Sequence, residues 1–296
     1  MKVGLPKGLL YQKYSPFIQR FFYELGTEII SSEETNKRIL DYGVKYCVDH
    51  ACIPIKVFHG HVMDIKDKCD MIVIPRIMSV KEREYICPKF CGLPEMIVNS
   101  IPDMPIITKK PLYINSPKKL LNWCHDAALP ITKSRGKVVK AFEAGLQEQQ
   151  KHKTGIDNLQ FQHKIALVGH PYNIYDDFIN MSIVKKLNRM GIGVCTEETI
   201  EDEFIDNMSH ELYKKPFWTF ARKNYGFSTY MALNGKIDGI VYLSSFACGI
   251  DSVVIELIKN KLQDFPIMVM KLDEHSGEAG FDTRLEAYSD MIKRRA

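Results

Sequence analysis

Short apolar runs rich in β-branched residues alternate along the chain with longer amphipathic stretches. In the first half, the runs predict four strands, at Lys2–Leu5, Thr27–Ser31, Asp70–Pro75 and Pro105–Thr108. The stretches between them predict helices over Tyr14–Leu25, Ser32–Val48, Ile55–Ile65 and Pro94–Ser100. Strands that alternate with helices through short connections are typical of an α/β fold with a parallel sheet.

The second half repeats this order. It predicts strands at Lys164–Gly169, Ile192–Cys195, Asp238–Tyr242 and Pro266–Met270, and a helix over Asp177–Met190 between the first two. Corresponding features, such as the helix-ending residues Gly26 and Gly191, lie between 161 and 168 residues apart. This near-constant spacing indicates an internal duplication.

The repeat predicts two Rossmann- or flavodoxin-like lobes with parallel sheets, a cleft between them, and extra helices. We assign residues 1–115 to the first α/β lobe, the mostly helical residues 116–160 to a helical connection, and residues 161–296 to the second α/β lobe. In a flavodoxin-like strand order 2-1-3-4, the loops after strands one and three flank the switch point, where ligands bind at the carboxyl ends of the strands.

Composition excludes several classes of protein. A chain of 296 residues that is 45% hydrophobic can bury a sizeable core. Its 40 basic and 36 acidic residues are interspersed, without the basic run expected of a nucleic-acid groove. No apolar run approaches the roughly 20 residues that cross a bilayer, and the start of the chain lacks the order of a signal peptide. We therefore expect a cytoplasmic protein that binds neither nucleic acid nor membrane.

Eight cysteines in a reducing compartment are not expected to form a disulfide framework. Four of them lie inside predicted helices or strands and are interpreted as core residues: Cys47, Cys69, Cys124 and Cys195. Cys52 lies at an element boundary, directly before Ile53-Pro54. Cys87 and Cys248 each lie in the loop after the third strand of their half, 161 residues apart. These positions predict that Cys52, Cys87 and Cys248 line the mouth of the cleft.

Three cysteines drawn from separate segments suit an iron–sulfur cluster that leaves one iron open to another ligand. Cys91, in a C-x3-C pair with Cys87, is a candidate fourth ligand, and the alternative is a structural thiol beside Gly92. No compact C-x-x-C-x-x-C run is present. The cluster prediction therefore depends on the positions of Cys52, Cys87 and Cys248 in the fold.

Other polar residues follow predicted strands of the second half. His170 is a candidate donor of a hydrogen bond to a bound ligand, or a residue that tunes a cluster, and local backbone bonding is the alternative. Three candidates for acid–base chemistry follow the fourth strand, namely Glu274, His275 and Glu278. Capping of the last helix by Ser276 is the structural alternative there.

Two further features have weaker functional interpretations. Lys7 and Lys89 are candidates to pair with an anionic ligand, with surface solvation as the alternative. His59 and His61 invite a zinc interpretation, but residues two apart on a helix point to different faces. The sequence therefore favours the cysteines as metal ligands over these histidines.

Five separated segments resemble those of the 2-hydroxyacyl-CoA dehydratase superfamily, and more narrowly the uncharacterised domain of CoA-substrate-specific enzyme activases. The segments span Asp49–His61, Glu84–Phe90, Gly169–Asp176, Phe246–Ser252 and Asp273–Gly280. The resemblance implies two Rossmann-like lobes that hold a [4Fe-4S] cluster through three cysteines, in oxygen-sensitive anaerobic metabolism. In the dehydratases, the open iron binds a CoA thioester carbonyl, and a separate ATPase with its own cluster supplies one low-potential electron.

The chain departs from both partners of that system. It has no glycine-rich phosphate loop, lacks the nucleotide-binding pattern of the activator ATPase, and is shorter than a typical dehydratase subunit. We therefore expect an iron–sulfur protein that relays low-potential electrons, with an ATP-hydrolysing activator as its partner. One alternative is a reductase or dehydratase that acts on a CoA thioester, and another is a cluster-free or zinc-binding scaffold module. Whether the chain forms homo- or hetero-oligomers stays open.

Overall fold

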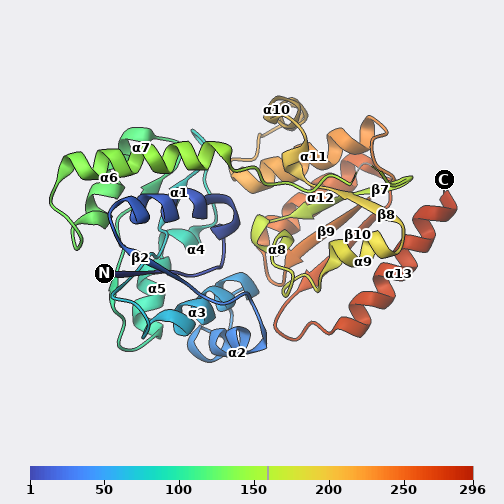
Figure 1. Cartoon of the computed structure of the whole chain (residues 1–296). Coiled ribbons are helices and arrows are strands. Elements are labelled where there is room, and N and C mark those ends of the chain that lie inside the picture. Colours follow the sequence, from blue (N-terminus) through green and yellow to red (C-terminus); the bar gives the residue numbers. More distant parts are fainter. Residues whose placement is uncertain (159, 296) are drawn as a thin grey trace. The chain divides into compact units, whose positions relative to one another are not determined.

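The computed structural model describes residues 1–158 and 160–295, and the chain divides into two compact units, residues 1–153 and 154–296 (Figure 1). Each unit contains its own four-stranded sheet, and all strand pairs of the named sheets are parallel. The predicted α/β class with parallel sheets is therefore confirmed.

The sheet of the first unit has the strand order β2-β1-β3-β5. Its strands are β1 (Lys2–Leu5), β2 (Glu28–Ser31), β3 (Met71–Ile72) and β5 (Ile106–Ile107). The connecting helices are α1 (Tyr11–Glu24), α2 (Lys37–Tyr46), α3 (Ile53–Ile65), α4 (Pro88–Cys91) and α5 (Leu93–Ser100). A separate two-stranded sheet pairs β4 (Ile77–Ser79) with β6 (Leu112–Tyr113). Two further helices, α6 (Pro117–Ala128) and α7 (Arg135–Lys151), complete the unit, and α7 packs along α1.

The sheet of the second unit has the order β8-β7-β9-β10. Its strands are β7 (His163–Gly169), β8 (Ile192–Cys195), β9 (Gly239–Ser245) and β10 (Ile267–Leu272). The helices are α8 (Pro171–Ile174), α9 (Ile183–Arg189), α10 (Asp202–His210), α11 (Thr219–Leu233), α12 (Gly249–Leu262) and α13 (Glu278–Arg295), with a short 3₁₀ turn at Glu197–Thr199. Numbered along each half, both sheets have the predicted order 2-1-3-4.

The internal duplication is visible in hydrogen bonds that tie the first strand of each unit to its third. The carboxylate of Asp70 accepts from the backbone nitrogen of Lys2 at 2.7 Å, and the nitrogen of Asp70 donates to the Lys2 carbonyl. Asp238 makes the same two bonds with Lys164, with its carboxylate 2.8 Å from the Lys164 nitrogen. An aspartate in front of the third strand thus closes the amino-terminal edge of the sheet in both halves.

A second shared feature joins the two helices that precede the third strand. A Cβ placed on Gly60 of α3 would come within 1.9 Å of the Ile39 carbonyl oxygen in α2. A Cβ on Gly226 of α11 would come within 2.3 Å of the Ile205 carbonyl oxygen in α10. Ile39 and Ile205 are 166 residues apart in the sequence, and Gly60 and Gly226 are separated by the same distance. Each unit therefore depends on a glycine for close backbone packing of this helix pair.

The predicted helix over Asp177–Met190 is wrong for its first half. Residues 177–182 lie outside the flanking helices α8 and α9, and Met181 and Ser182 both adopt a left-handed φ of 54°. The Asp176 carboxylate accepts from the nitrogens of Phe178 and Ile179, and this side-chain bonding competes with helix formation. Apolar spacing predicted a helix here, but local bonding favours a turn.

Candidate functional site

Cys52 and Cys87 each lie directly before the first residue of a helix in the first unit. Cys52 is the N-cap of α3 and Cys87 is the N-cap of α4, and neither side chain caps its helix by a hydrogen bond. Because α3 leads into the start of β3, its first residue lies toward the carboxyl ends of the strands. Cys52 therefore lies at the ligand-binding edge predicted for this fold.

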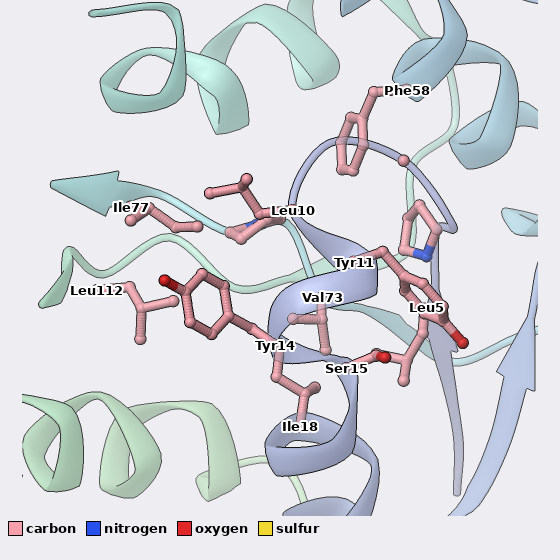
Figure 2. A pocket seen from close by; sticks show the side chains of 13 residues that line it. Leu5, Leu10, Tyr11, Tyr14, Ser15, Ile18, Phe58, Val73, Ile77 and Leu112 are labelled. Carbon is pink, nitrogen blue, oxygen red and sulfur yellow. The ribbon is translucent and has the colours of Figure 1, made fainter. Parts of the chain in front are cut away.

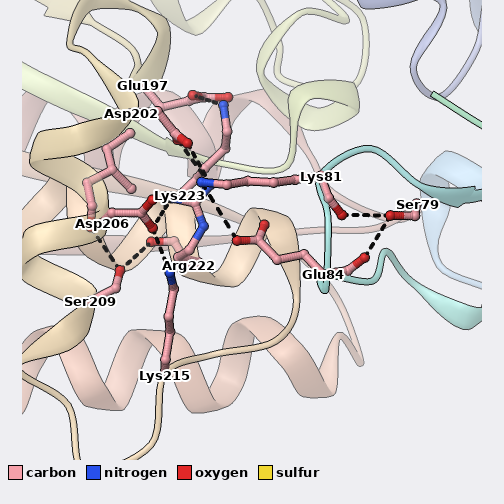
Figure 3. Close-up of polar contacts among 11 residues, drawn as sticks. Ser79, Lys81, Glu84, Glu197, Asp202, Asp206, Ser209, Lys215, Arg222 and Lys223 are labelled. Atoms are coloured by element: carbon pink, nitrogen blue, oxygen red, sulfur yellow. Dashed lines mark hydrogen bonds and ion pairs between the residues drawn. The ribbon is translucent and has the colours of Figure 1, made fainter. Parts of the chain in front are cut away.

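The loop before Cys87 is held by Ser79 at the end of β4. The Ser79 hydroxyl donates to the Lys81 carbonyl oxygen at 2.7 Å and to the Glu84 carbonyl oxygen at 3.0 Å. Figure 3 draws both contacts. Arg83 within this loop adopts a left-handed φ of 60°. These bonds fix a tight turn, and the position of Cys87 follows from it.

The thiols of Cys52, Cys87 and Cys91 share one electrostatic environment. Burial raises the pKa of the Cys87 thiol, the neighbouring Cys52 and Cys91 thiols raise it further, and the backbone and charge of Lys89 oppose them. The Lys89 ammonium also donates to the Cys52 sulfur at 3.4 Å. Three cysteines and one cation therefore gather on this side of the unit.

Cys248 occupies the corresponding place in the second unit. It follows β9 and is the N-cap of α12, which leads into β10 as α4 and α5 lead into β5. The preceding Ala247 adopts a left-handed φ of 60°, which a non-glycine residue reaches only at a cost of about 1 kcal/mol. The nitrogen of Cys248 donates to the Ser245 carbonyl at 3.1 Å. A sharp turn thus presents this thiol at the start of a long helix.

His170 lies beside Cys248 because of the strand register. Gly169 ends β7 opposite Leu243 of β9, and a Cβ on Gly169 would come within 2.4 Å of the Leu243 carbonyl oxygen. The next residue, His170, is 3% exposed, stacks on Tyr172 with ring centroids 4.9 Å apart, and meets Phe220 edge-on at 5.6 Å. Its imidazole is therefore fixed by aromatic rings on two sides.

A buried chain of hydrogen bonds holds His170. Its Nδ1 lies 3.2 Å from Oδ1 of Asp251, which also accepts from the Tyr242 hydroxyl at 2.8 Å. Asn224 donates to that hydroxyl at 3.0 Å. Burial raises the pKa of Asp251, but the attraction of His170 and the bonds from His170, Tyr242 and Ser244 outweigh it, so the pKa is lowered. Asp251 is therefore held as a carboxylate although none of its surface is exposed.

These side chains form a set of metal donors within the second unit. A ring nitrogen of His170, the sulfur of Cys248 and a carboxylate oxygen of Asp251 all lie within 4.8 Å of one another. Asp251 was not singled out by the sequence. The available signal was its position three residues after Cys248, which puts both on one face of the first turn of α12.

The structure gives the other candidate residues different surroundings. Glu278 pairs with Lys186 at 2.6 Å, and Oε1 of Glu274 lies 3.9 Å from Nε2 of His275, whose side chain is 86% exposed. Ser276 bonds back to Asp273 rather than to a helix nitrogen. The acid–base role of Glu274, His275 and Glu278 stays a prediction.

Of the other predicted residues, Lys7 pairs with Glu34, and His59 and His61 are both buried. His59 bonds to the Ile55 carbonyl, whereas His61 lies between the hydroxyls of Ser32 and Thr35. Among the cysteines interpreted as core residues, Cys47, Cys124 and Cys195 are buried, but Cys69 is only partly so and donates to the Ile65 carbonyl. All eight cysteines are thiols without disulfide bonds.

An apolar recess lies at the carboxyl ends of β1 and β3 (Figure 2). It encloses about 40 Å³ and is lined mainly by aliphatic and aromatic side chains, among them Leu5, Tyr14, Phe58, Val73 and Leu112. The switch point of the first unit therefore offers little to a phosphate group, in agreement with the missing phosphate loop in the sequence.

A charged network of the second unit was not predicted. The fully buried Arg222 of α11 pairs with Asp202 and Asp206 of α10, each at 3.0 Å (Figure 3). Lys223 pairs with Glu197 at 2.6 Å, and Lys215 pairs with Asp206 at 2.8 Å. These pairs tie α10 to α11 and to the turn before them, and they have a structural explanation.

The donor set of the chain fits an iron–sulfur cluster in chemical terms. Cluster irons are bound by cysteine thiolates, and the structure holds Cys52, Cys87 and Cys248 as partly buried thiols at the starts of helices. Cys52 and Cys248 lie at the N-caps of the long helices α3 and α12, where the positive end of a helix attracts a negatively charged group. The Lys89 ammonium adds a positive charge beside Cys52.

The fold and these side chains define an α/β protein of two doubly wound units, each carrying thiols at the ligand-binding edge of its sheet. The chain belongs to the family described as the CoA enzyme activase uncharacterised domain, whose match spans residues 2–200. The suspected family is therefore confirmed. A search of curated proteins finds no matching relative. No helix of the described residues is long and apolar enough to cross a membrane.

Solved structures show only remote likeness. A manganese-bound mutant of a periplasmic metal-binding protein from Candidatus Liberibacter asiaticus is 10% identical, with a TM-score of 0.29 and 99% of each chain covered. A glutamate racemase from Bacillus anthracis is 11% identical, with a TM-score of 0.23, over 100% of this chain and 82% of the racemase. A mutant laminin-binding adhesin from Streptococcus agalactiae is 10% identical, with a TM-score of 0.27, over 99% of this chain and 98% of the adhesin. These scores are too low to bear on function.

Proposed function

We propose that this protein binds one [4Fe-4S] cluster through the thiolates of Cys52, Cys87 and Cys248 and transfers low-potential electrons. The observation that carries the proposal is the gathering of Cys52 and Cys87 beside Lys89, together with Cys248 at the matching helix start of the second unit. Membership of the CoA enzyme activase family supports it. The bound cluster would supply one-electron chemistry.

The residues around the thiols have distinct roles in this proposal. Lys89 places its ammonium 3.4 Å from the Cys52 sulfur, where it balances the negative charge that deprotonated thiols bring. Because opposite charge near a redox centre stabilises the reduced form, Lys89 raises the potential of the cluster. Cys91 follows Cys87 by four residues and is the proposed alternative for the fourth ligand.

The partner that we propose is an ATP-hydrolysing activator protein with its own cluster. The family supports an activase-related system, and the chain lacks a phosphate loop of its own. An alternative function is catalytic, with a CoA thioester bound at the open iron and reduced or dehydrated there. Turnover of a CoA ester by the reduced protein alone favours this alternative over electron relay.

Anaerobic reconstitution with iron and sulfide tests the cluster. We expect about four irons and four sulfides per chain, and loss of most of both in each of the variants Cys52→Ala, Cys87→Ala and Cys248→Ala. The control is Cys195→Ala, which removes a buried thiol of β8 and should leave the content unchanged. Absence of iron and sulfide after reconstitution refutes the proposal, and full content in the three variants refutes the ligand assignment.

The variant Cys91→Ala decides the fourth ligand. If Cys91 binds the fourth iron, its loss changes the electron paramagnetic resonance spectrum of the reduced cluster while most of the iron stays bound. An unchanged spectrum assigns the fourth position to another group.

A further inference from the structure

We infer that, when the cluster is absent, the second unit binds a single divalent metal ion through Cys248, His170 and Asp251. The inference rests on the proposed function only in that Cys248 is shared by both sites. All three ligands of the single ion come from residues 154–296, whereas the cluster also needs Cys52 and Cys87.

The spacing of the donors fits one ion. Bonds of about 2.0–2.3 Å in a tetrahedral arrangement place two donor atoms about 3.5 Å apart. The sulfur, nitrogen and oxygen of the three side chains already lie within 4.8 Å of one another. Ligands of different irons in a cluster stand further apart, because they point outward from its corners. The longest distances between donor atoms would have to shorten by roughly 1 Å for all three atoms to bind one ion.

An unsatisfied atom of Asp251 is an independent sign of a missing partner. Its Oδ2 is buried and has no partner within hydrogen-bond geometry among the described residues, although the neighbouring Ser244 hydroxyl helps to lower the pKa of this carboxylate. Burial of a carboxylate oxygen without a hydrogen-bond partner is costly. Oδ1 of the same residue accepts from Tyr242 and faces His170, so the carboxylate cannot turn freely. A cation bound at Oδ2 would satisfy this atom.

The surroundings hold the donors in place as metal sites require. Tyr242 and Asn224 fix the Asp251 carboxylate from behind, and Tyr172 and Phe220 fix the His170 ring. Cys248 and Asp251 share the first turn of α12, so their spacing is set by the helix.

The donor types select the ion. A thiolate, an imidazole and a carboxylate together suit Zn²⁺ or Fe²⁺, whereas Mg²⁺ and Ca²⁺ prefer oxygen ligands alone. Three protein ligands leave a fourth position for water. Because one thiolate cannot serve both sites at once, a bound Zn²⁺ ion blocks the uptake of the cluster, and the metal supply would regulate the function proposed above.

Titration of the cluster-free, reduced full-length protein with Zn²⁺, in competition with a chromophoric chelator, tests the inference. We expect one ion per chain. Cys248→Ser and His170→Gln should weaken binding by more than the roughly 10–100-fold typical of outer-shell changes, and Tyr242→Phe should weaken it less. The matched controls are Cys52→Ser and Cys87→Ser, which remove cluster ligands of the first unit and should leave Zn²⁺ affinity unchanged.

Binding of Co²⁺ gives a second readout that does not depend on affinity. A thiolate-to-cobalt charge-transfer band should appear in the unchanged protein and disappear in Cys248→Ser, with far-ultraviolet circular dichroism showing that the variant is folded. Zn²⁺ binding that survives in folded Cys248→Ser, or that is lost in Cys52→Ser, overturns the inference. Absence of saturable binding overturns it as well.

The two proposals fail in different ways. If the protein binds Zn²⁺ as expected but never assembles a cluster, the cluster proposal fails and the single-ion site stands. If the cluster assembles but the cluster-free protein binds no Zn²⁺, the single-ion site fails. Preloading with Zn²⁺ should slow the uptake of iron and sulfide at least several-fold, and a chelator should restore it. Unchanged uptake in Zn²⁺-loaded protein overturns the regulatory part.

Discussion

His61 shows how a single buried side chain makes stability depend on pH. It is fully buried in α3, and burial lowers its pKa to about 4 from 6.5, with repulsion by Lys7 adding to the shift and attraction by Asp64 opposing it. The hydroxyls of Ser32 and Thr35 lie 2.9 and 3.0 Å from its two ring nitrogens. The imidazole is therefore neutral in the folded protein at pH 7.

Acid should destabilise the protein through His61. Below pH 6.5 the unfolded chain binds a proton at His61 that the folded chain does not bind until about pH 4, so stability present above pH 6.5 is lost as the pH falls toward 4. At pH 5 this lowers the free energy of unfolding by about 2 kcal/mol.

Urea unfolding of the cluster-free protein at pH 7 and pH 5 measures this loss. In His61→Gln the difference between the two pH values should shrink by about 2 kcal/mol. The control is His275→Gln, at a side chain that is 86% exposed, which should keep the full difference. An unchanged difference in His61→Gln would contradict the role of this residue.

Residue-scale pairing was the least predictable part of the candidate site. His170 was a candidate because it follows a predicted strand, but its contact with Asp251 joins residues 81 positions apart. That contact depends on the register of β7 against β9, which pairs Gly169 with Leu243, and on the turn at Ala247. Hydrophobic spacing reports which face of a strand is buried, but it does not report register between strands separated by several helices.

Helices and strands were predictable where the burial of apolar side chains determines the sequence pattern. The strand at Lys2–Leu5 was predicted to the residue, because its last three residues are buried and lack polar side chains. Helix α11 was missed, since it is buried on most sides and its polar residues, such as Arg222 and Asn224, bond inside the protein. Its amphipathic pattern is correspondingly weak. The helix predicted over 177–182 was wrong for the opposite reason, because side-chain hydrogen bonds favour a turn where the apolar pattern favours a helix.

The paired glycines give a prediction at the scale of elements. Gly60→Ala and Gly226→Ala each place a methyl group against a backbone carbonyl of the neighbouring helix, which cannot move aside as a side chain can. Overpacking of this kind costs roughly 1–3 kcal/mol or more, and the better helix propensity of alanine offsets up to about 1 kcal/mol. We expect a net loss of about 2 kcal/mol in each variant.

Thermal and urea unfolding measure this loss, and Gly136→Ala is the matched control. Gly136 also lies in a helix, α7, but apart from its chain neighbours and the backbone of its own helix, no atom lies within 4 Å of the added Cβ. Its substitution should leave stability unchanged or raise it slightly. Equal stability in Gly136→Ala and Gly226→Ala would show that the helix pair adapts without cost.

At the scale of the whole molecule, the duplication could be predicted because it repeats patterns rather than contacts. The strand order, the aspartate before the third strand and the glycine between two helices recur in both units. The units have diverged in what they carry. Cys52 is the N-cap of α3, whereas the residue 166 positions later, Trp218, is the N-cap of α11. Within the part of the chain that the structure describes, only the second unit brings a histidine and a buried carboxylate to its cysteine.

This divergence predicts how the two units behave apart. Residues 154–296 contain a complete four-stranded sheet and a core whose members, such as Val168, Tyr225 and Val254, all belong to the unit. A chain of about 140 residues buries enough surface to fold alone.

The fragment should unfold cooperatively in urea and bind Zn²⁺ as tightly as the cluster-free full-length protein, because the three proposed ligands lie within it. It should assemble no [4Fe-4S] cluster, since it lacks Cys52 and Cys87. The same fragment with Cys248→Ser is the control and should bind no Zn²⁺, whereas stoichiometric cluster assembly in the unsubstituted fragment would remove the first unit from the proposed ligand set.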